Sequence, residues 1–75
     1  MKELVEYVAK SLVDDPSQVE VGIEPDGNFV VLKLHVAPED AGRVIGKDGR
    51  VASALRVLLR AMAAREGKRV TLKID

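Results

Sequence analysis

Two glycines three residues apart, Gly46 and Gly49, interrupt a stretch that would otherwise form one long helix. Residues 38–45 begin with a proline and two acidic residues, which suit the first turn of a helix. Residues 50–66 carry apolar side chains at helical spacing and end before a glycine. Glycine adopts positive φ and lets another backbone approach closely. The spacing therefore predicts two helices joined by a tight corner.

The rest of the chain has the patterns of one more helix and three strands. Residues 2–13 predict an amphipathic helix with an apolar stripe of Leu4, Val5, Val8 and Leu12. Alternation with a period of two predicts strands over residues 19–24, 30–36 and 68–74, with a turn at residues 25–28. The order α-β-β-α-α-β over residues 1–75 predicts one α+β domain. It is a two-layer sandwich in which three helices cover one face of a three-stranded sheet.

The long helix offers several candidate faces. Val51, Leu55, Leu58 and Met62 share one face and are predicted to lie in the core, with Arg56 and Arg60 roughly opposite. The smaller residues Ala54, Val57 and Ala61 fall at the edge of the core-facing side. We expect them to be partly buried against the first helix. The alternative is that they seat a second copy of the chain or another protein.

Composition excludes several functions. A chain of 75 residues without cysteine and with one histidine has no disulfide framework, no thiolate metal site and too few ligands for a conventional zinc site. We expect no large catalytic cleft in a domain of this size. His35 is expected to be exposed, and the acidic pairs at residues 14–15 and 39–40 are interpreted as helix-end residues. No signal peptide or long apolar run is found. We therefore expect a cytoplasmic protein without a cofactor, an enzymatic activity or a membrane segment.

The net charge of zero conceals an asymmetry. Residues 1–40 carry three lysines against nine acidic residues, a net charge of −6, and residues 41–75 carry nine basic against three acidic residues, a net charge of +6. Segregated charge is one cue for an anionic partner, although an uneven solvated surface is the alternative. The corner supports the first interpretation. Lys47 lies at its tip, Arg43 and Arg50 flank it, and the N-terminus of the next helix presents free N–H groups to an anion. A helix-capping turn without a ligand remains the alternative.

The segment RVIGKDGRVASALRVLLR, residues 43–60, resembles the signature of a KH domain, in which Ile-Gly-x-x-Gly joins two helices. The order of elements is similar to the bacterial type II arrangement, and the resemblance covers essentially the whole chain. The chain resembles the small, stand-alone KH-domain RNA-binding proteins of the KhpA family. That resemblance implies a loop that clamps about four nucleotides of single-stranded RNA. It also implies a cytoplasmic RNA chaperone or post-transcriptional regulator that self-associates and pairs with a larger multidomain KH protein of the Jag type.

The resemblance also implies roles for individual residues. The RNA-binding set is Arg43, Ile45, Gly46, Lys47, Asp48, Gly49 and Arg50. The strand near residues 70–72 would form the other wall of the groove, and the variable loop at residues 66–68 is very short. For Ile45 and Leu55 we favour core packing over contact with a base. Asp48 would repel phosphate unless Lys47 compensates, or unless Asp48 turns away to cap the next helix.

Other kinds of nucleic-acid binding fit less well. A helix-turn-helix protein presents polar side chains that contact bases along its recognition helix, whereas the long helix here is mostly apolar. An RNA-recognition motif needs aromatic residues on its sheet, and this chain has only Phe29 and Tyr7. An assembly module with little RNA affinity of its own is the alternative from a different class.

Overall fold

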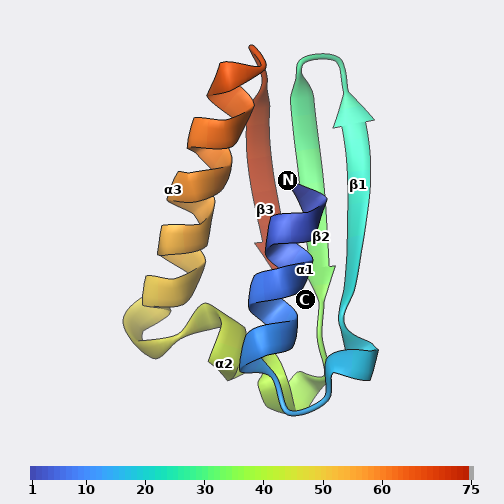
Figure 1. Cartoon of the computed structure of the whole chain (residues 1–75), viewed down its shortest axis with the longest axis vertical. Helices are drawn as coiled ribbons and strands as arrows, with labels where there is room; N and C mark the ends of the chain where they lie inside the picture. The colour runs from blue at the N-terminus through green and yellow to red at the C-terminus, as the bar shows by residue number, and fades with distance from the viewer. Residues whose placement is uncertain (75) are drawn as a thin grey trace.

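Three helices pack with a three-stranded sheet in the computed structural model, which describes residues 1–74; two of them lie over one face, and the short one lies beyond the end of the strands (Figure 1). The elements are α1 (Lys2–Leu12), β1 (Glu20–Asp26), β2 (Phe29–His35), α2 (Ala41–Ile45), α3 (Arg50–Arg65) and β3 (Arg69–Ile74). Short 3-10 turns at Pro16–Gln18, Pro38–Asp40 and Lys47–Gly49 connect them. The predicted α+β class and the order of helices and strands are confirmed.

The sheet is mixed, with the strand order β1-β2-β3. β1 and β2 form an antiparallel hairpin, whereas β3 lies parallel to β2 because α2 and α3 form the crossover between them. The register aligns Leu32 of β2 with Ile23 on one side and with Leu72 on the other. The alternating apolar residues of the sheet therefore point toward the helices, as the period of two predicts.

The hairpin loop is shorter than the predicted turn. Pro25 pairs with Val30 and Asp26 pairs with Phe29, so that only Gly27 and Asn28 form the loop. Gly27 has φ 63°, which glycine adopts without steric cost. Proline is tolerated inside β1 because this strand lies at the edge of the sheet, where its missing N–H breaks no ladder. The prediction of a turn over residues 25–28 was wrong for its first two residues.

The core lies between α1, α3 and the sheet. Its largest fully buried side chains are Val5, Leu32, Leu34, Val36 and Leu59. Two residues expected in apolar stripes are exposed instead: Leu12 at the end of α1 by 38% and Ile23 of β1 by 49%. The helices lie over β2 and β3, and they leave most of β1 uncovered (Figure 1).

The helix α3 packs through a different face from the predicted one. Its buried residues are Ala52, Leu55, Leu59 and Ala63, whereas Leu58 is 52% exposed and Met62 is 38% exposed. The predicted apolar stripe and the buried stripe share Leu55. Both have helical spacing, so the spacing alone does not show which of them packs against the sheet. The alanines leave room for the helix to approach the sheet closely, so that the stripe with less apolar surface is the one in the core.

The expected partial burial of Ala54, Val57 and Ala61 against α1 was also wrong. All three are exposed, Val57 by 59%. They lie on the side of α3 that faces away from its buried stripe. The outer face of α3 is therefore more apolar than that of an ordinary surface helix.

Candidate nucleic-acid interface

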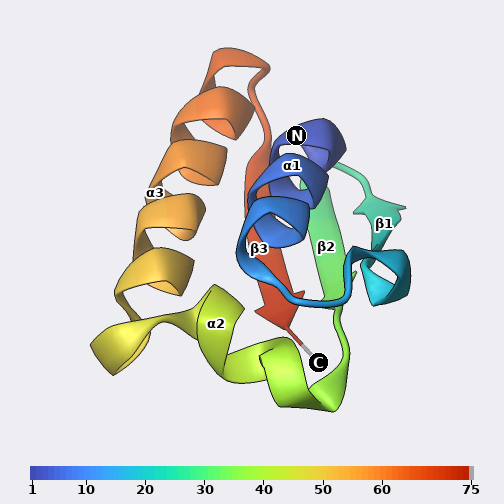
Figure 2. The same cartoon turned by 60° about the horizontal axis from the view of Figure 1, so that its bottom comes forward.

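The predicted corner between α2 and α3 is confirmed, and it protrudes from the fold (Figure 2). Gly46 follows α2 with φ 79° and ψ 172°, and its N–H donates to the carbonyl of Gly42 at 2.9 Å. Asp48 and Gly49 then adopt φ 58° and φ 74°. Three positive φ angles in four residues turn the chain sharply enough for α3 to begin directly at Arg50.

The two glycines of the corner answer different requirements. A Cβ atom on Gly46 would lie 2.5 Å from Cγ2 of Val51 and 2.9 Å from its backbone nitrogen. A Cβ atom on Gly49 would meet nothing within 4 Å. Gly46 therefore provides both the positive φ and the close approach of α2 to α3, whereas Gly49 provides the backbone conformation alone.

The side chains of the corner face solvent. Lys47, Asp48 and Arg50 are exposed, and Ile45 is 41% exposed. Leu55 is buried as expected, but the core packing expected for Ile45 was wrong. The N-cap of α3 is Gly49 and has no side-chain hydrogen bond, so Asp48 does not cap this helix. The corner thus exposes a lysine, an arginine, an apolar side chain and the first N–H groups of a 16-residue helix.

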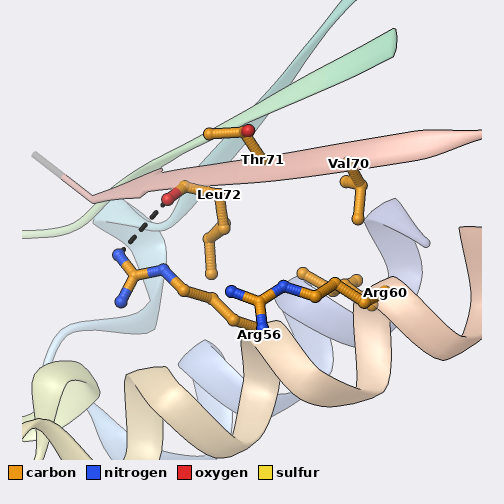
Figure 3. A pocket seen from close by; sticks show the side chains of 6 residues that line it. Arg56, Arg60, Val70, Thr71 and Leu72 are labelled. Atoms are coloured by element: carbon orange, nitrogen blue, oxygen red, sulfur yellow. Dashed lines mark hydrogen bonds between the residues drawn. The ribbon is translucent and has the colours of Figure 1, made fainter. Parts of the chain in front are cut away.

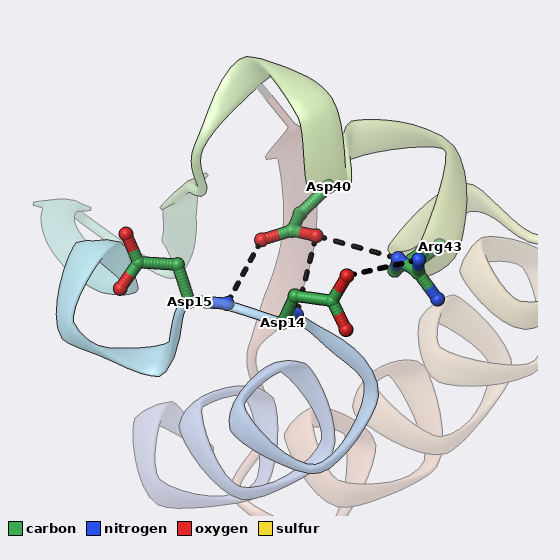
Figure 4. A network of polar contacts seen from close by, with 4 residues as sticks. All are labelled: Asp14, Asp15, Asp40 and Arg43. Atoms are coloured by element: carbon green, nitrogen blue, oxygen red, sulfur yellow. Dashed lines mark hydrogen bonds and ion pairs between the residues drawn. The ribbon is translucent and has the colours of Figure 1, made fainter.

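Arg43 points away from the corner, toward a group of carboxylates (Figure 4). Its Nη2 lies 3.0 Å from Oδ2 of Asp14, and its Nε lies 3.4 Å from Oδ1 of Asp40. Asp40 is 3% exposed and accepts hydrogen bonds from the backbone N–H groups of Asp14 at 3.2 Å and Asp15 at 3.1 Å. Asp40 therefore joins the end of α1 to the start of α2. Two nitrogen atoms of the Arg43 guanidinium already contact these carboxylates. The contact of Arg43 with phosphate stays a prediction.

A groove lies between α3 and β3 (Figure 3). It contains a cavity of about 150 Å³ lined by Arg56, Leu59, Arg60, Val70, Thr71 and Leu72. The Nη2 of Arg56 donates a hydrogen bond to the carbonyl of Leu72 at 3.3 Å. Because β3 is an edge strand, alternate backbone groups on its outer side have no partner strand. One wall of the groove therefore offers backbone donors and acceptors and the other offers guanidinium groups.

The placement of Arg56 and Arg60 was predicted wrongly. The rotation of α3 that buries Leu55 and Leu59 brings the residue after each of them to the flank beside β3, so these arginines are not opposite the core. The sequence does contain one signal for this placement. Arg56 and Arg60 have i, i+4 spacing and directly follow Leu55 and Leu59, which belong to the buried stripe.

The charge asymmetry of the sequence becomes a spatial one. The basic residues of the corner, the groove and the start of β3 are Lys47, Arg50, Arg56, Arg60, Lys68 and Arg69. The acidic residues Glu20, Glu24 and Asp26 lie on β1, at the opposite edge of the sheet. Glu24 accepts a hydrogen bond from Lys33 at 2.7 Å, and this contact with the lysine charge lowers the pKa of Glu24. The groove side of the molecule is therefore the side suited to an anion.

Two further properties bear on the kind of site. Within residues 1–74, no group of three or more His, Cys, Asp or Glu side chains is placed to hold a metal ion. Over the same residues, none of the helices combines the length and apolar character needed to cross a bilayer.

A Gly-x-x-Gly corner between two helices, within α-β-β-α-α-β order on a three-stranded sheet, defines a KH domain. The family model described as KhpA/KhpB, KH domain, matches residues 2–74. The chain belongs to the KhpA/KhpB family of KH domains.

Curated relatives agree with this assignment. The RNA-binding protein KhpA of Clostridium acetobutylicum is 50% identical over 74 residues, which cover 99% of each chain. That of Halalkalibacterium halodurans is 47% identical over 74 residues, 99% of this chain and 97% of the relative. That of Aquifex aeolicus is 46% identical over 74 residues, 99% of this chain and 94% of the relative. No solved structure matches the chain significantly.

Proposed function

We propose that the protein binds single-stranded RNA along the groove between α3 and β3, with the Gly46–Gly49 corner holding the phosphate backbone. The observation that carries the proposal is the juxtaposition of the exposed corner with a groove bordered by arginines. Relatives that are 46–50% identical over almost their whole length are named RNA-binding protein KhpA, which supports the same class of ligand.

At the corner, the glycines leave the backbone open to a close approach by phosphate. The free N–H groups at the start of α3 and the positive end of its dipole attract the anion. Lys47 and Arg50 add positive charge on either side of Asp48. The negative charge of Asp48 weakens the attraction for phosphate but does not cancel it. Because one acidic residue lies among these groups, we expect weak binding. The affinity should still fall as salt rises, since the basic groups bind phosphate charges. The contact of Arg43 with phosphate is a weaker part of the proposal, since Asp14 and Asp40 already bind its guanidinium.

Along the groove, bases can lie with their faces on apolar side chains and their edges toward polar groups. Ile45, directly before the corner, offers exposed apolar surface, and Val70 lines the groove. Arg56 and Arg60 contribute guanidinium donors, and β3 contributes backbone groups. Single-stranded RNA suits such a groove because its unpaired bases expose both faces and hydrogen-bonding edges.

The proposal includes a setting. We propose a single domain over residues 1–75 that acts in the cytoplasm as an RNA chaperone or post-transcriptional regulator, without catalysis or a cofactor.

A second candidate function is assembly with another copy or with a larger, multidomain KH protein. The exposed apolar residues on the outer face of α3, among them Val57 and Leu58, favour it. The two functions are compatible, because that face and the groove are different sides of the helix.

The substitution Lys47→Asp tests the corner. We expect it to raise the Kd for a labelled single-stranded RNA by roughly tenfold or more in fluorescence anisotropy, because a phosphate contact is lost and a repulsion is added. The slope of the logarithm of the binding constant against the logarithm of the salt concentration should become smaller in magnitude by about one. The melting temperature should not change, since Lys47 is exposed. The matched control is Lys10→Asp on α1, which makes the same charge change on an exposed residue of another element. An unchanged Kd for Lys47→Asp would remove the corner from the site.

The substitution Arg60→Gln tests the groove independently of the corner. We expect it to raise the Kd by roughly five- to tenfold, because a charge-assisted contact with RNA is worth somewhat over 1 kcal/mol. Arg65→Gln is the matched control, since Arg65 is exposed on the same helix but does not line the groove. Equal effects of the two substitutions would show that only net charge matters, and the α3–β3 groove would then not be the binding surface.

A further inference from the structure

A second cavity lies at the end of the groove farthest from the corner. Its volume is about 320 Å³, and its lining residues are Phe29, Arg60, Ala64, Lys68, Arg69 and Val70. Arg60 and Val70 also line the first cavity, so the two cavities are adjacent. The helical rise places this end about 22 Å from the corner along α3.

The cavity combines an aromatic ring with positive charge. Phe29 is 38% exposed, and it is the only phenylalanine of the chain. Three of the six lining residues are basic and none is acidic. Aromatic side chains beside basic residues are the groups on which proteins stack the bases of single-stranded nucleic acids. A site for a cationic or a purely apolar ligand would not have this composition.

Packing of the hydrophobic core does not account for Phe29. Its register with Asp26 and Arg69 places it in the alternation that points away from the core, whereas its neighbour Val30 is 8% exposed and belongs to the core. A single exposed apolar residue needs no explanation by itself. Here, however, Phe29 borders a cavity beside the proposed RNA groove, and so do Lys68 of the loop before β3 and Arg69 at the start of β3.

The loop before β3 leaves this end of the groove open. The N–H of Lys68 donates to the carbonyl of Ala63 at 2.9 Å, and that of Gly67 donates to the carbonyl of Ala64 at 3.1 Å. These bonds close a tight turn directly on the end of α3. A bound strand could therefore continue past Val70 without meeting a covering loop.

We propose that this cavity is a subsite for one unpaired nucleotide beyond those held in the main groove, with its base stacked on Phe29 and its phosphate between Lys68 and Arg69. The inference rests on the proposed RNA binding and extends it: the footprint exceeds the roughly four nucleotides that a KH groove clamps. The subsite selects for a single strand and not for a base, because every base has a face that stacks.

A length series tests the subsite. Labelled single-stranded RNAs of four, six and eight nucleotides are titrated with the wild type, Phe29→Leu, Phe29→Tyr and the aromatic control Tyr7→Leu. We expect the wild type to bind six nucleotides roughly tenfold more tightly than four, a gain typical of one stacked base. Phe29→Leu should lose this gain and keep its affinity for four nucleotides. Phe29→Tyr and Tyr7→Leu should keep the gain, since the first retains a ring and Tyr7 lies on α1, outside the cavity.

Backbone amide shifts of the ¹⁵N-labelled wild type separate the two proposals. With six nucleotides, we expect shifts at residues 46–50 and at residues 28–29 and 68–70, whereas four nucleotides should move mainly the first set. Shifts confined to residues 46–50 at every length would overturn the subsite and leave the proposed function standing. Shifts confined to residues 28–29 and 68–70 would overturn the corner as the clamp and keep the subsite. In the length series, an equal loss of affinity by Phe29→Leu at all lengths would assign Phe29 a structural role and overturn the subsite. The absence of shifts in both sets of residues would overturn the subsite and the proposed function.

Discussion

Replacing Gly46 with alanine is expected to lower the free energy of unfolding by about 2 to 5 kcal/mol, the sum of a positive-φ strain and an overpacking cost. The strain arises because Gly46 has φ 79°, and the overpacking arises because the new Cβ would lie 2.5 Å from Cγ2 of Val51 and 2.9 Å from its backbone nitrogen. Backbone cannot move aside as a flexible side chain can. In a domain of this size, the melting temperature should fall by more than about 10 °C. Thermal unfolding followed by circular dichroism measures it, and Gly46→Val should be worse still.

The matched control is Gly49→Ala in the same corner. Gly49 has a similar φ of 74°, but a Cβ there would meet nothing within 4 Å. This variant should lose only about 1 to 2 kcal/mol, the cost of a left-handed conformation for an L-residue. The difference between the two variants therefore isolates the steric cost of the α2–α3 approach. Equal melting temperatures would contradict the close contact between Gly46 and Val51.

Replacing Asp40 with alanine is expected to lower the free energy of unfolding by about 3 kcal/mol, because it removes a buried charged acceptor from two backbone donors at once. The Asp40 side chain accepts the N–H groups of Asp14 and Asp15 and lies 3.4 Å from Arg43 (Figure 4). With alanine at this position, those donors lose their partner and the link between the ends of α1 and α2 loosens. Urea unfolding of the variant and the wild type, with equal slopes, measures the difference.

Asp14→Ala is the control for the ion pair alone. Asp14 lies 3.0 Å from Arg43, but its side chain is 78% exposed, so the pair should contribute less than about 1 kcal/mol. A loss for Asp14→Ala as large as that for Asp40→Ala would mean that the ion pair stabilises this link, and not the backbone hydrogen bonds to Asp40. An intermediate loss for Asp40→Asn is expected, because an amide keeps one acceptor oxygen and gives up the charge.

Local sequence patterns were sufficient to predict the order of helices and strands and the corner between α2 and α3. The period of the apolar residues changes from helical to alternating and back, and this change needs no distant contact to be meaningful. Gly46 and Gly49 mark the break between α2 and α3 because few other residues accept the φ angles found there. The loop of the candidate site, including Lys47 and Arg50, could therefore be placed from the sequence.

Tertiary structure alone decided the rest of the candidate site. The rotation of α3 depends on how closely its alanines approach the sheet, and that rotation puts Arg56 and Arg60 in the groove. The cavity at Phe29 exists because β3 pairs in parallel beside β2, which brings Phe29 and Arg69, 40 positions apart in the sequence, to the same end of the sheet. Asp40 reaches its backbone partners across 25 and 26 residues of chain. Sequence periodicity describes which residues share a face of one element. It carries no information on which of two similar faces packs inward, because that choice depends on the shape of the surface opposite.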